Sequence, residues 1–266
     1  LSEQGVEQAR KEKSLELKKI IDQAPERSLV FIGPASELIR THSTARLYGE
    51  GLKELYQGDE SVAVLIKEDV DEIRKKRKKD SSESLSQEVK NLEEFINSAE
   101  NQNKKIVLGY PLFIKQFSFL KRWNDAYSDY LDKKYGDDEI GFMKEWLKTK
   151  GDSGTEGLKG PDPDKVAEEY LFGLERVKEF IKEYLGNRPL VIAPVTHGFD
   201  LEAAIIKLIK GEATPEAFDS ILGENFLETT EGAEVIIEGN KMQIYFRGKK
   251  YDVEVSEDEK QDVPQT

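Results

Sequence analysis

The stretch SLVFIGP (Ser28–Pro34) decides the fold class, because its apolar run suits one buried strand and is too short for a helix. Its Gly-Pro end is typical of a turn. A second apolar run, SVAVLI, covers residues 61–66, and apolar residues spaced three or four apart predict a helix over 43–56. A strand, a helix and a second strand in this order predict an α/β fold with a parallel sheet.

The flanking sequence extends this pattern in both directions. Apolar periodicity predicts helices over 4–23 and 164–185, and Gly186 is placed to cap the second of them. A short strand is expected over 105–108. The run PLVIAPV (Pro189–Val195) is apolar on both faces, as in a central parallel strand.

The last third of the chain predicts a buried helix and a small antiparallel sheet. Residues 201–209 are apolar nearly all round, which indicates burial. Three short strands near 235–237, 242–246 and 251–255 are separated by Gly-Asn and Gly-Lys pairs at hairpin spacing. We therefore predict a three-layer α-β-α fold with a mostly parallel sheet, a helical insertion and a C-terminal β-meander.

Length and composition limit the domain organisation. The 266 residues fit one large or two small domains. We expect a single α/β domain over residues 1–255, with 74–160 as a helical insertion or cap and 256–266 as a disordered acidic tail.

Charge and cysteine content exclude several function classes. Forty Lys and Arg against 53 Asp and Glu give a net charge of −13, which argues against a general nucleic-acid binder. The sequence has no cysteine, so disulfides, thiolate metal sites and cysteine nucleophiles are excluded. This composition fits a reducing compartment, and we expect a cytoplasmic protein. No apolar run approaches the 18 residues of a membrane span, and we expect no membrane partner.

Two features of the insertion have competing interpretations. The basic run RKKRKK (74–79) is either a phosphate or nucleic-acid patch or the solvated face of a helix, and the net charge favours the second. The aromatic-rich segment 111–150 is either packing between helices or a cap over a ligand, and its spacing favours packing.

Two short stretches directly follow predicted strands. The first, SELIRTHSTA, covers Ser36–Ala45, and the second, VTHG, covers Val195–Gly198. Ligands of open α/β sheets bind at the carboxyl ends of the strands, so Arg40 and His197 are expected to converge in one crevice. Helix N-termini there would favour an anion. Taken alone, Arg40 suits a surface or capping role, and His197 suits a structural one.

These motifs resemble those of the histidine phosphatase superfamily, the phosphoglycerate mutase-like proteins. That family carries a Leu-Thr-x-x-Gly-x-x-Gln-Ala stretch, then Ser-x-Leu-x-Arg-[Ala/Thr]-x-x-Thr-Ala, then Val-[Thr/Ser]-His-Gly. LSEQGVEQA (Leu1–Ala9) is similar to the first, Ser36–Ala45 to the second and Val195–Gly198 to the third, in the family's order. The resemblance covers residues 1–74 and 163–209 and implies a phosphoglycerate mutase-like fold.

The chain departs from the family at one motif. The Arg-His-Gly that carries the family's nucleophilic His is absent, and His42 and His197 are the two histidines of the sequence. We expect an N-terminal segment to precede Leu1 and to hold that motif on a strand. In the family this strand is central, so a sheet without it would have a gap lined by unpaired backbone groups.

The resemblance implies phosphoryl transfer through a phosphohistidine intermediate. Arg40 would hold the equatorial phosphate oxygens with its planar fork, and His197 would act as a catalytic donor to them. Ser36 and Gly198 would contribute to phosphate binding, although Ser36 equally suits a helix cap, and Thr196 would orient the loop. Glu72 would protonate the leaving oxygen, with Asp71 and Glu68 as rivals.

Two function classes follow from this interpretation. The first is a phosphomonoester hydrolase, or a phosphosugar mutase, that acts on a phosphorylated small molecule without metal or other cofactor. The second is a catalytically inactive relative that binds a phosphorylated ligand or a protein partner. A third interpretation, an unrelated hydrolase or nucleotide binder, lacks its motifs: the sequence has no Gly-x-Ser-x-Gly and no phosphate-binding glycine loop.

Overall fold

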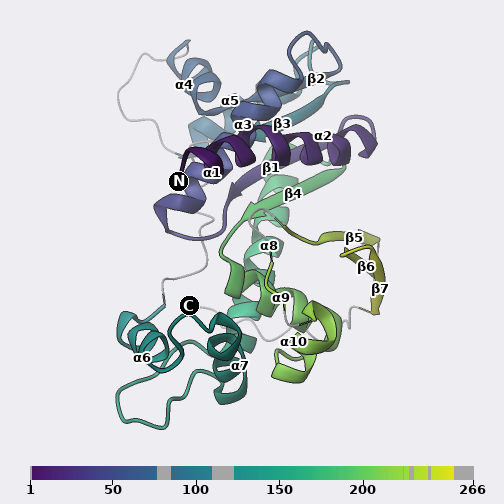
Figure 1. Ribbon diagram of the computed structural model, residues 1–266. Helices are drawn as coiled ribbons and strands as arrows, with labels where there is room; N and C mark the ends of the chain where they lie inside the picture. Colours follow the sequence, from purple (N-terminus) through teal and green to yellow (C-terminus); the bar gives the residue numbers. More distant parts are fainter. Residues whose placement is uncertain are drawn as a thin grey trace. The chain divides into compact units, whose positions relative to one another are not determined.

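The computed structural model describes residues 2–76, 85–109, 123–223, 225–227, 231–238 and 241–254 (Figure 1). Its contacts divide the chain into two compact units. The first contains residues 1–122 and 169–197, and the second contains 123–168 and 198–266. The predicted single domain over 1–255, with its insertion over 74–160, uses different boundaries and stays a prediction. We describe each unit separately.

The first unit contains the parallel sheet. Its strands are β1 (Leu29–Pro34), β2 (Val62–Leu65), β3 (Lys105–Gly109) and β4 (Leu190–Val195), in the order β2-β3-β1-β4, all parallel. Its helical segments are α1 (Glu3–Glu7), the π-helical η1 (Gln8–Lys13), α2 (Ser14–Gln23), α3 (Ile39–Leu55), α4 (Lys67–Lys76), α5 (Leu85–Ile96) and the part of α8 (Pro163–Leu185) from residue 169 onward.

Helices cover both faces of this sheet. On one face, Leu29 and Phe31 of β1 pack with buried residues of α4, α5 and α8. On the other face, Val30 and Ile32 pack with buried residues of η1, α2 and α3. The alternation of side chains along β1 divides them between the two clusters. This confirms the predicted three-layer α-β-α architecture.

The position of β4 differs from the prediction. We expected a central strand, but β4 pairs with β1 alone and forms an edge of the four described strands. Its apolar pattern has another cause, because both faces of β4 are partly covered, with every residue of the strand half-buried. Leu190 and Ile192 pack against one cluster, and Val191, Ala193 and Val195 pack against the other.

The expected gap in the sheet is also not seen. Strand β1 is hydrogen-bonded to β3 on one side and to β4 on the other, so its backbone groups are paired in both directions.

A third difference concerns α3, which begins at Ile39 and not near Ser43. The first turn of α3 has no apolar stripe, since Ile39 is 83% exposed, and periodicity therefore placed the start too late.

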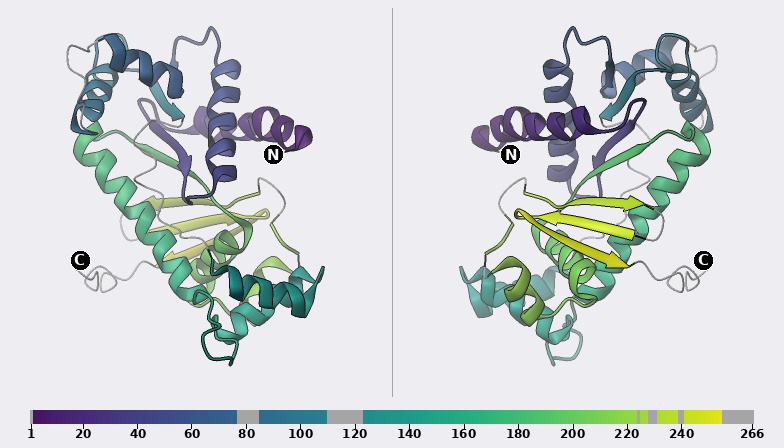
Figure 2. Two further views of the ribbon diagram at one scale, coloured as in Figure 1. Left: turned by 90° about the vertical axis from the view of Figure 1, so that its left-hand side faces the viewer. Right: turned by 90° about the vertical axis from the view of Figure 1, so that its right-hand side faces the viewer.

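The second unit combines helices with the predicted meander (Figure 2). Its helices are α6 (Asp125–Tyr135), α7 (Glu139–Thr149), the first residues of α8, α9 (Gly198–Lys210) and α10 (Pro215–Leu222). Strands β5 (Glu234–Glu238), β6 (Lys241–Phe246) and β7 (Lys249–Glu254) form an antiparallel sheet in that order. The predicted β-meander is confirmed.

Aromatic side chains form much of the interior of the second unit. Trp123 packs against Trp146 at a centroid distance of 4.4 Å, and Phe142 packs against Phe199 at 5.1 Å. The Trp146 indole, fully buried, donates a hydrogen bond to the Pro161 carbonyl. For residues 123–150, these contacts support packing rather than a ligand cap. Segment 110–122, with Phe113, Phe117 and Phe119, lies outside the described residues, as do 77–79 of the basic run and the tail 256–266.

Helix α9 buries two carboxylates that its apolar pattern did not predict. Asp200 accepts a hydrogen bond from the Trp123 indole at 3.1 Å. Glu202 is fully buried, and its Oε1 accepts from the Leu227 amide at 2.7 Å. Its Oε2 has no hydrogen-bond partner within the described part of the chain. Burial raises the pKa of Glu202 to about 7, although the Leu227 amide and the charge of Arg247 act in the opposite direction.

Glu202 should make the protein less stable as the pH rises. Because its pKa is about 4.5 when exposed and about 7 when folded, the folded state binds the extra proton between these values, and stability falls across this interval. We expect Glu202→Gln to raise the free energy of unfolding at pH 8 by about 2 kcal/mol. Urea titrations at pH 5 and pH 8 measure both effects. An equal stability difference between wild type and variant at the two pH values would contradict this role.

Candidate functional site

The pairing of β1 with β4 brings two distant parts of the sequence together. Pro34 lies opposite Val195, and the Ala35 amide donates to the Val195 carbonyl at 2.8 Å. Continuing this register by two residues places Ser36 beside His197 at the carboxyl ends of both strands. The Ser36 Oγ lies 2.7 Å from the His197 Nε2, across a sequence separation of 161 residues.

Both ring nitrogens of His197 form hydrogen bonds. The Arg40 Nε donates to the His197 Nδ1 at 3.1 Å. Because a guanidinium can only donate, Nδ1 must carry a lone pair, and in the neutral ring the proton is on Nε2. His197 therefore donates to the Ser36 Oγ. This tautomer cannot accept the hydroxyl proton, so the pair is not arranged as a serine nucleophile with its general base.

Ser36 occupies a rigid position. It is buried, and its Oγ also accepts a hydrogen bond from the Leu38 amide at 3.2 Å. Thr41 fixes the same turn, since its hydroxyl lies 2.7 Å from the Leu38 carbonyl and 3.2 Å from the Ser36 carbonyl. With its lone pairs engaged by two donors, the Ser36 hydroxyl retains its own proton for donation to an acceptor.

Arg40 lies on the first turn of α3 and is exposed. The N-cap residue of this helix, Leu38, provides no side-chain hydrogen bond to the helix. The positive end of a 17-residue helix therefore adds to the Arg40 charge at the carboxyl edge of the sheet. Such an arrangement attracts anions.

The environment of His197 keeps its ring neutral. Burial lowers the pKa of His197 to about 4, and the neighbouring Arg40 charge lowers it further in the same direction. At neutral pH the ring therefore retains the single Nε2 proton deduced from the hydrogen bonds. A neutral ring is also what the Arg40 hydrogen bond requires, since its acceptor Nδ1 must be unprotonated.

The titration of His197 can be measured directly. We expect its imidazole C–H signals in NMR spectra to titrate with a midpoint near pH 4. Removing a positive neighbour favours the protonated ring, so Arg40→Ala should raise this midpoint, by about one unit. His42→Gln assigns the signals, because the sequence contains two histidines. A midpoint near 6.5 in the wild type, or no change in the variant, would show that the ring lies in a different environment.

The structure thus brings together Ser36, Arg40 and His197, and their roles stay predictions. Gly198 is exposed and is the first residue of α9, in the second unit. The Thr196 hydroxyl is buried and has no hydrogen-bond partner in the described ranges, so no hydrogen bond of these residues supports the predicted role in orienting the loop.

The candidate acids are placed differently. Glu72 is exposed on α4, which follows β2 at the opposite edge of the sheet from β4. Strands β3 and β1 lie between those edges, which separates β2 from β4 by about 14 Å. Of its rivals, Glu68 forms an ion pair with Arg46 at 2.9 Å, and Asp71 lies 3.8 Å from Lys67. The assignment of Glu72 as the acid stays a prediction without a supporting contact.

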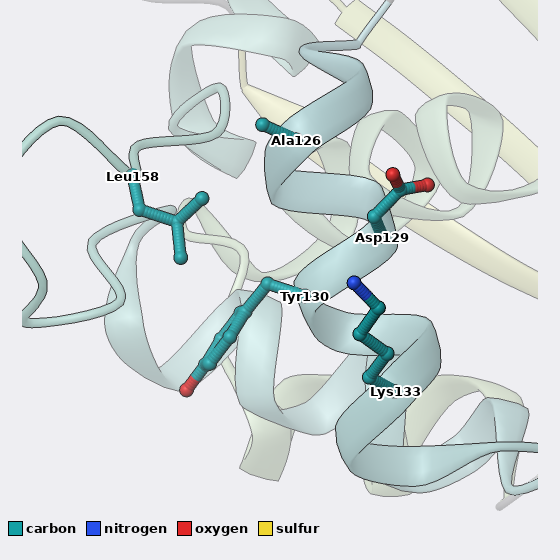
Figure 3. Close-up of a pocket in the computed structure, with 5 residues that line it drawn as sticks. All are labelled: Ala126, Asp129, Tyr130, Lys133 and Leu158. Atoms are coloured by element: carbon teal, nitrogen blue, oxygen red, sulfur yellow. The ribbon is translucent and has the colours of Figure 1, made fainter.

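Other features of the described chain offer no stronger site. The second unit has an open recess of about 350 Å³. Figure 3 shows the side chains that line it, which come from α6 and, for Leu158, from a loop. Its polar side chains, Asp129, Tyr130 and Lys133, include no nucleophile paired with a base. The described residues contain no cluster of three metal-ligating side chains. Within the same residues, every helix is too short or too polar to cross a bilayer.

Comparisons with protein-family models, with characterised proteins and with solved structures found no match to this chain. Its function must therefore be inferred from the site itself, and membership of the histidine phosphatase superfamily stays a proposal.

Proposed function

We propose that this chain binds the phosphoryl group of a phosphomonoester at Ser36, Arg40 and His197, and that this binding serves a phosphatase or phosphosugar mutase reaction. The convergence of these three side chains at the carboxyl ends of β1 and β4 carries the proposal. They combine a planar cationic fork with two polar hydrogens, which suits the three equatorial oxygens of a transferring phosphoryl group.

The neutral state of His197 also supports phosphate binding. The Ser36 hydroxyl proton is a donor that an incoming oxygen can use directly. The Nε2 proton, which His197 donates to the Ser36 Oγ, becomes a second donor when a phosphate oxygen replaces Ser36 as its acceptor. Arg40 is exposed and can turn from the His197 Nδ1 toward an anion. A bound dianion would then raise the pKa of the ring and favour its doubly protonated form, which adds a charge-assisted hydrogen bond.

A complete hydrolysis requires a nucleophile that these residues do not supply. In the proposed reaction, a histidine of an Arg-His-Gly segment preceding Leu1 attacks phosphorus, the P–O bond to the leaving group breaks, and a carboxylic acid protonates the leaving oxygen. Water then attacks the phosphohistidine and releases phosphate. Glu72 remains the candidate acid from the sequence motif.

The alternative function is phosphate recognition without catalysis. It is favoured by one observation: the described site contains binding groups, and its histidine is engaged through both ring nitrogens. In this case the chain would bind a phosphorylated ligand or a phosphorylated protein partner through the same three residues.

Two measurements separate these functions. Isothermal titration with inorganic phosphate tests binding by this chain. Hydrolysis of p-nitrophenyl phosphate without added metal, assayed for this chain and for the product of the full reading frame, tests catalysis. Binding with hydrolysis by the longer product supports a phosphatase, and binding alone supports the alternative. Absence of Arg40-dependent phosphate binding would overturn both.

A further inference from the structure

Two arginines meet at the amino-terminal edge of the parallel sheet, the edge opposite the candidate phosphate site. Arg27 precedes β1, and Arg188 precedes β4, the strand that pairs with β1. The Gln102 carbonyl accepts hydrogen bonds from both, at 3.1 Å from the Arg27 Nε and 3.1 Å from the Arg188 Nη2. The two donor atoms are therefore separated by at most twice this distance.

Arg188 has an unusual environment for a guanidinium. Its side chain is buried, with 7% of the residue exposed, and its Nη2 donates to the Lys104 carbonyl at 2.7 Å as well as to Gln102. Its Nε and Nη1 are buried and have no hydrogen-bond partner among the residues that the structure describes. A buried cation normally has an ionic partner, because removing it from water is costly.

The charges around this pair do not supply one. Burial and the positive charge of Arg27 both lower the pKa of Arg188, and no carboxylate of the described chain acts on it. Two cations thus share one neutral acceptor, at a short separation that repels them. The unpaired N–H groups of Arg188 and the excess positive charge of the two arginines indicate that a negatively charged hydrogen-bond acceptor would be stabilised between them.

We propose that Arg27 and Arg188 bind a small tetrahedral oxyanion, such as phosphate or sulfate, at this edge of the sheet. A compact anion suits the site because the Arg188 guanidinium is buried. A ligand must reach this group inside the protein, and a small anion can do so more easily than a side chain of another protein. Arg27 is exposed, so it can move to admit the anion and then close on it. The anion would cancel the repulsion between the cations and satisfy the free donors of Arg188. This inference does not depend on the proposed function.

The test uses the Arg40→Ala variant of the whole chain, in which phosphate binding at the candidate site is weakened. Inorganic phosphate is titrated at constant ionic strength while the Nε–H signals of Arg27 and Arg188 are followed by NMR. We expect both signals to shift with one saturable curve, and sulfate to compete with phosphate. Chloride at the same ionic strength should leave both signals in place.

A second substitution tests the partnership of the two arginines. Arg27→Gln, added to Arg40→Ala, should weaken phosphate binding at least about tenfold. The matched control is Lys19→Gln, which removes one exposed cation of the same unit and should leave the affinity unchanged. Gln keeps the Cβ of Arg27 at its positive φ of 63°, so the two variants differ from their parents in charge and not in backbone strain.

Two outcomes would overturn the proposal. One is the absence of any shift of the Arg188 signal with phosphate or sulfate in the Arg40→Ala background. The other is an equal loss of affinity in Arg27→Gln and Lys19→Gln, which would indicate general charge attraction. Neither outcome affects the proposed function, which depends on the phosphate binding that Arg40→Ala weakens.

Discussion

Arg40→Ala should weaken the binding of inorganic phosphate to the candidate site about 30-fold. Arg40 provides the single guanidinium of this site, and a charge-assisted hydrogen bond contributes about 1.5–3 kcal/mol. The side chain is exposed, so solvent screening places the loss at about 2 kcal/mol, which corresponds to this factor. Isothermal titration at pH 7 measures it.

Arg40→Lys distinguishes charge from shape. Lysine keeps the positive charge but lacks the planar fork that matches two phosphate oxygens, so its loss should lie between wild type and Arg40→Ala. The control is Arg46→Ala, on the same helix. Arg46 forms ion pairs with Glu50 at 2.8 Å and Glu68 at 2.9 Å, and its loss should change phosphate affinity less than about twofold. Equal effects of Arg40→Ala and Arg46→Ala would show that phosphate responds to net charge, and the site would be wrong.

The strands of the sheet were predictable because their residues alternate between two apolar environments. The run over β1 has no polar residue, and the structure accounts for this, since successive side chains enter opposite cores. The same property made the position of β4 unpredictable. An edge strand covered by helices on both faces has the same apolar pattern as a central strand, and the pattern carries no information on which strands are its neighbours.

The convergence of Ser36, Arg40 and His197 could be predicted from the sequence, and the hydrogen bonds between them could not. Motif order placed Ser36, Arg40 and His197 at strand ends, and the register of β1 with β4 brings them within hydrogen-bond distance. The tautomer of His197 depends on which partner faces each nitrogen, and this requires coordinates. The assignment of Glu72 relied on distance along the chain from β2, which does not report that β2 lies at the far edge of the sheet.

The buried charged groups gave no signal in the sequence. The apolar neighbours of Glu202 predicted a buried helix, and Arg188 directly precedes an apolar strand, but neither pattern showed that the charged side chain itself is enclosed by tertiary packing. Periodicity reports the apolar face of a helix, as for α9, and says nothing about a polar residue that the fold encloses. The burial of such charged groups is therefore seen in the structure and not in the sequence pattern.

Gly51→Ala should destabilise the protein by at least about 3 kcal/mol, although Gly to Ala in a helix interior is ordinarily stabilising. Gly51 lies on α3, where it contacts η1 and the start of α2. A Cβ on Gly51 would lie 2.0 Å from the Arg10 carbonyl oxygen, 2.3 Å from the Ser14 Oγ and 2.8 Å from the Ser14 Cβ. Urea unfolding should show the loss of stability, and thermal unfolding should show a decrease in Tm of about 10 °C.

The control for this prediction is Gly232→Ala. Gly232 is exposed, and a Cβ there would meet no atom within 4 Å, so stability should change by less than about 0.5 kcal/mol. An increase in stability for Gly51→Ala, as helix propensity alone requires, would show that α3 and η1 are not in close contact.

A double variant identifies which contact is responsible. Ser14→Ala removes the hydroxyl that would lie 2.3 Å from the new Cβ but leaves the Arg10 carbonyl in place. No rotamer change moves a backbone oxygen, so relief would require α3 to separate from η1 and α2 and to expose the core between Tyr48, Leu52 and Ile21. Gly51→Ala with Ser14→Ala should therefore stay destabilised by most of the single-variant loss. Full recovery in the double variant would instead assign the constraint to the Ser14 side chain.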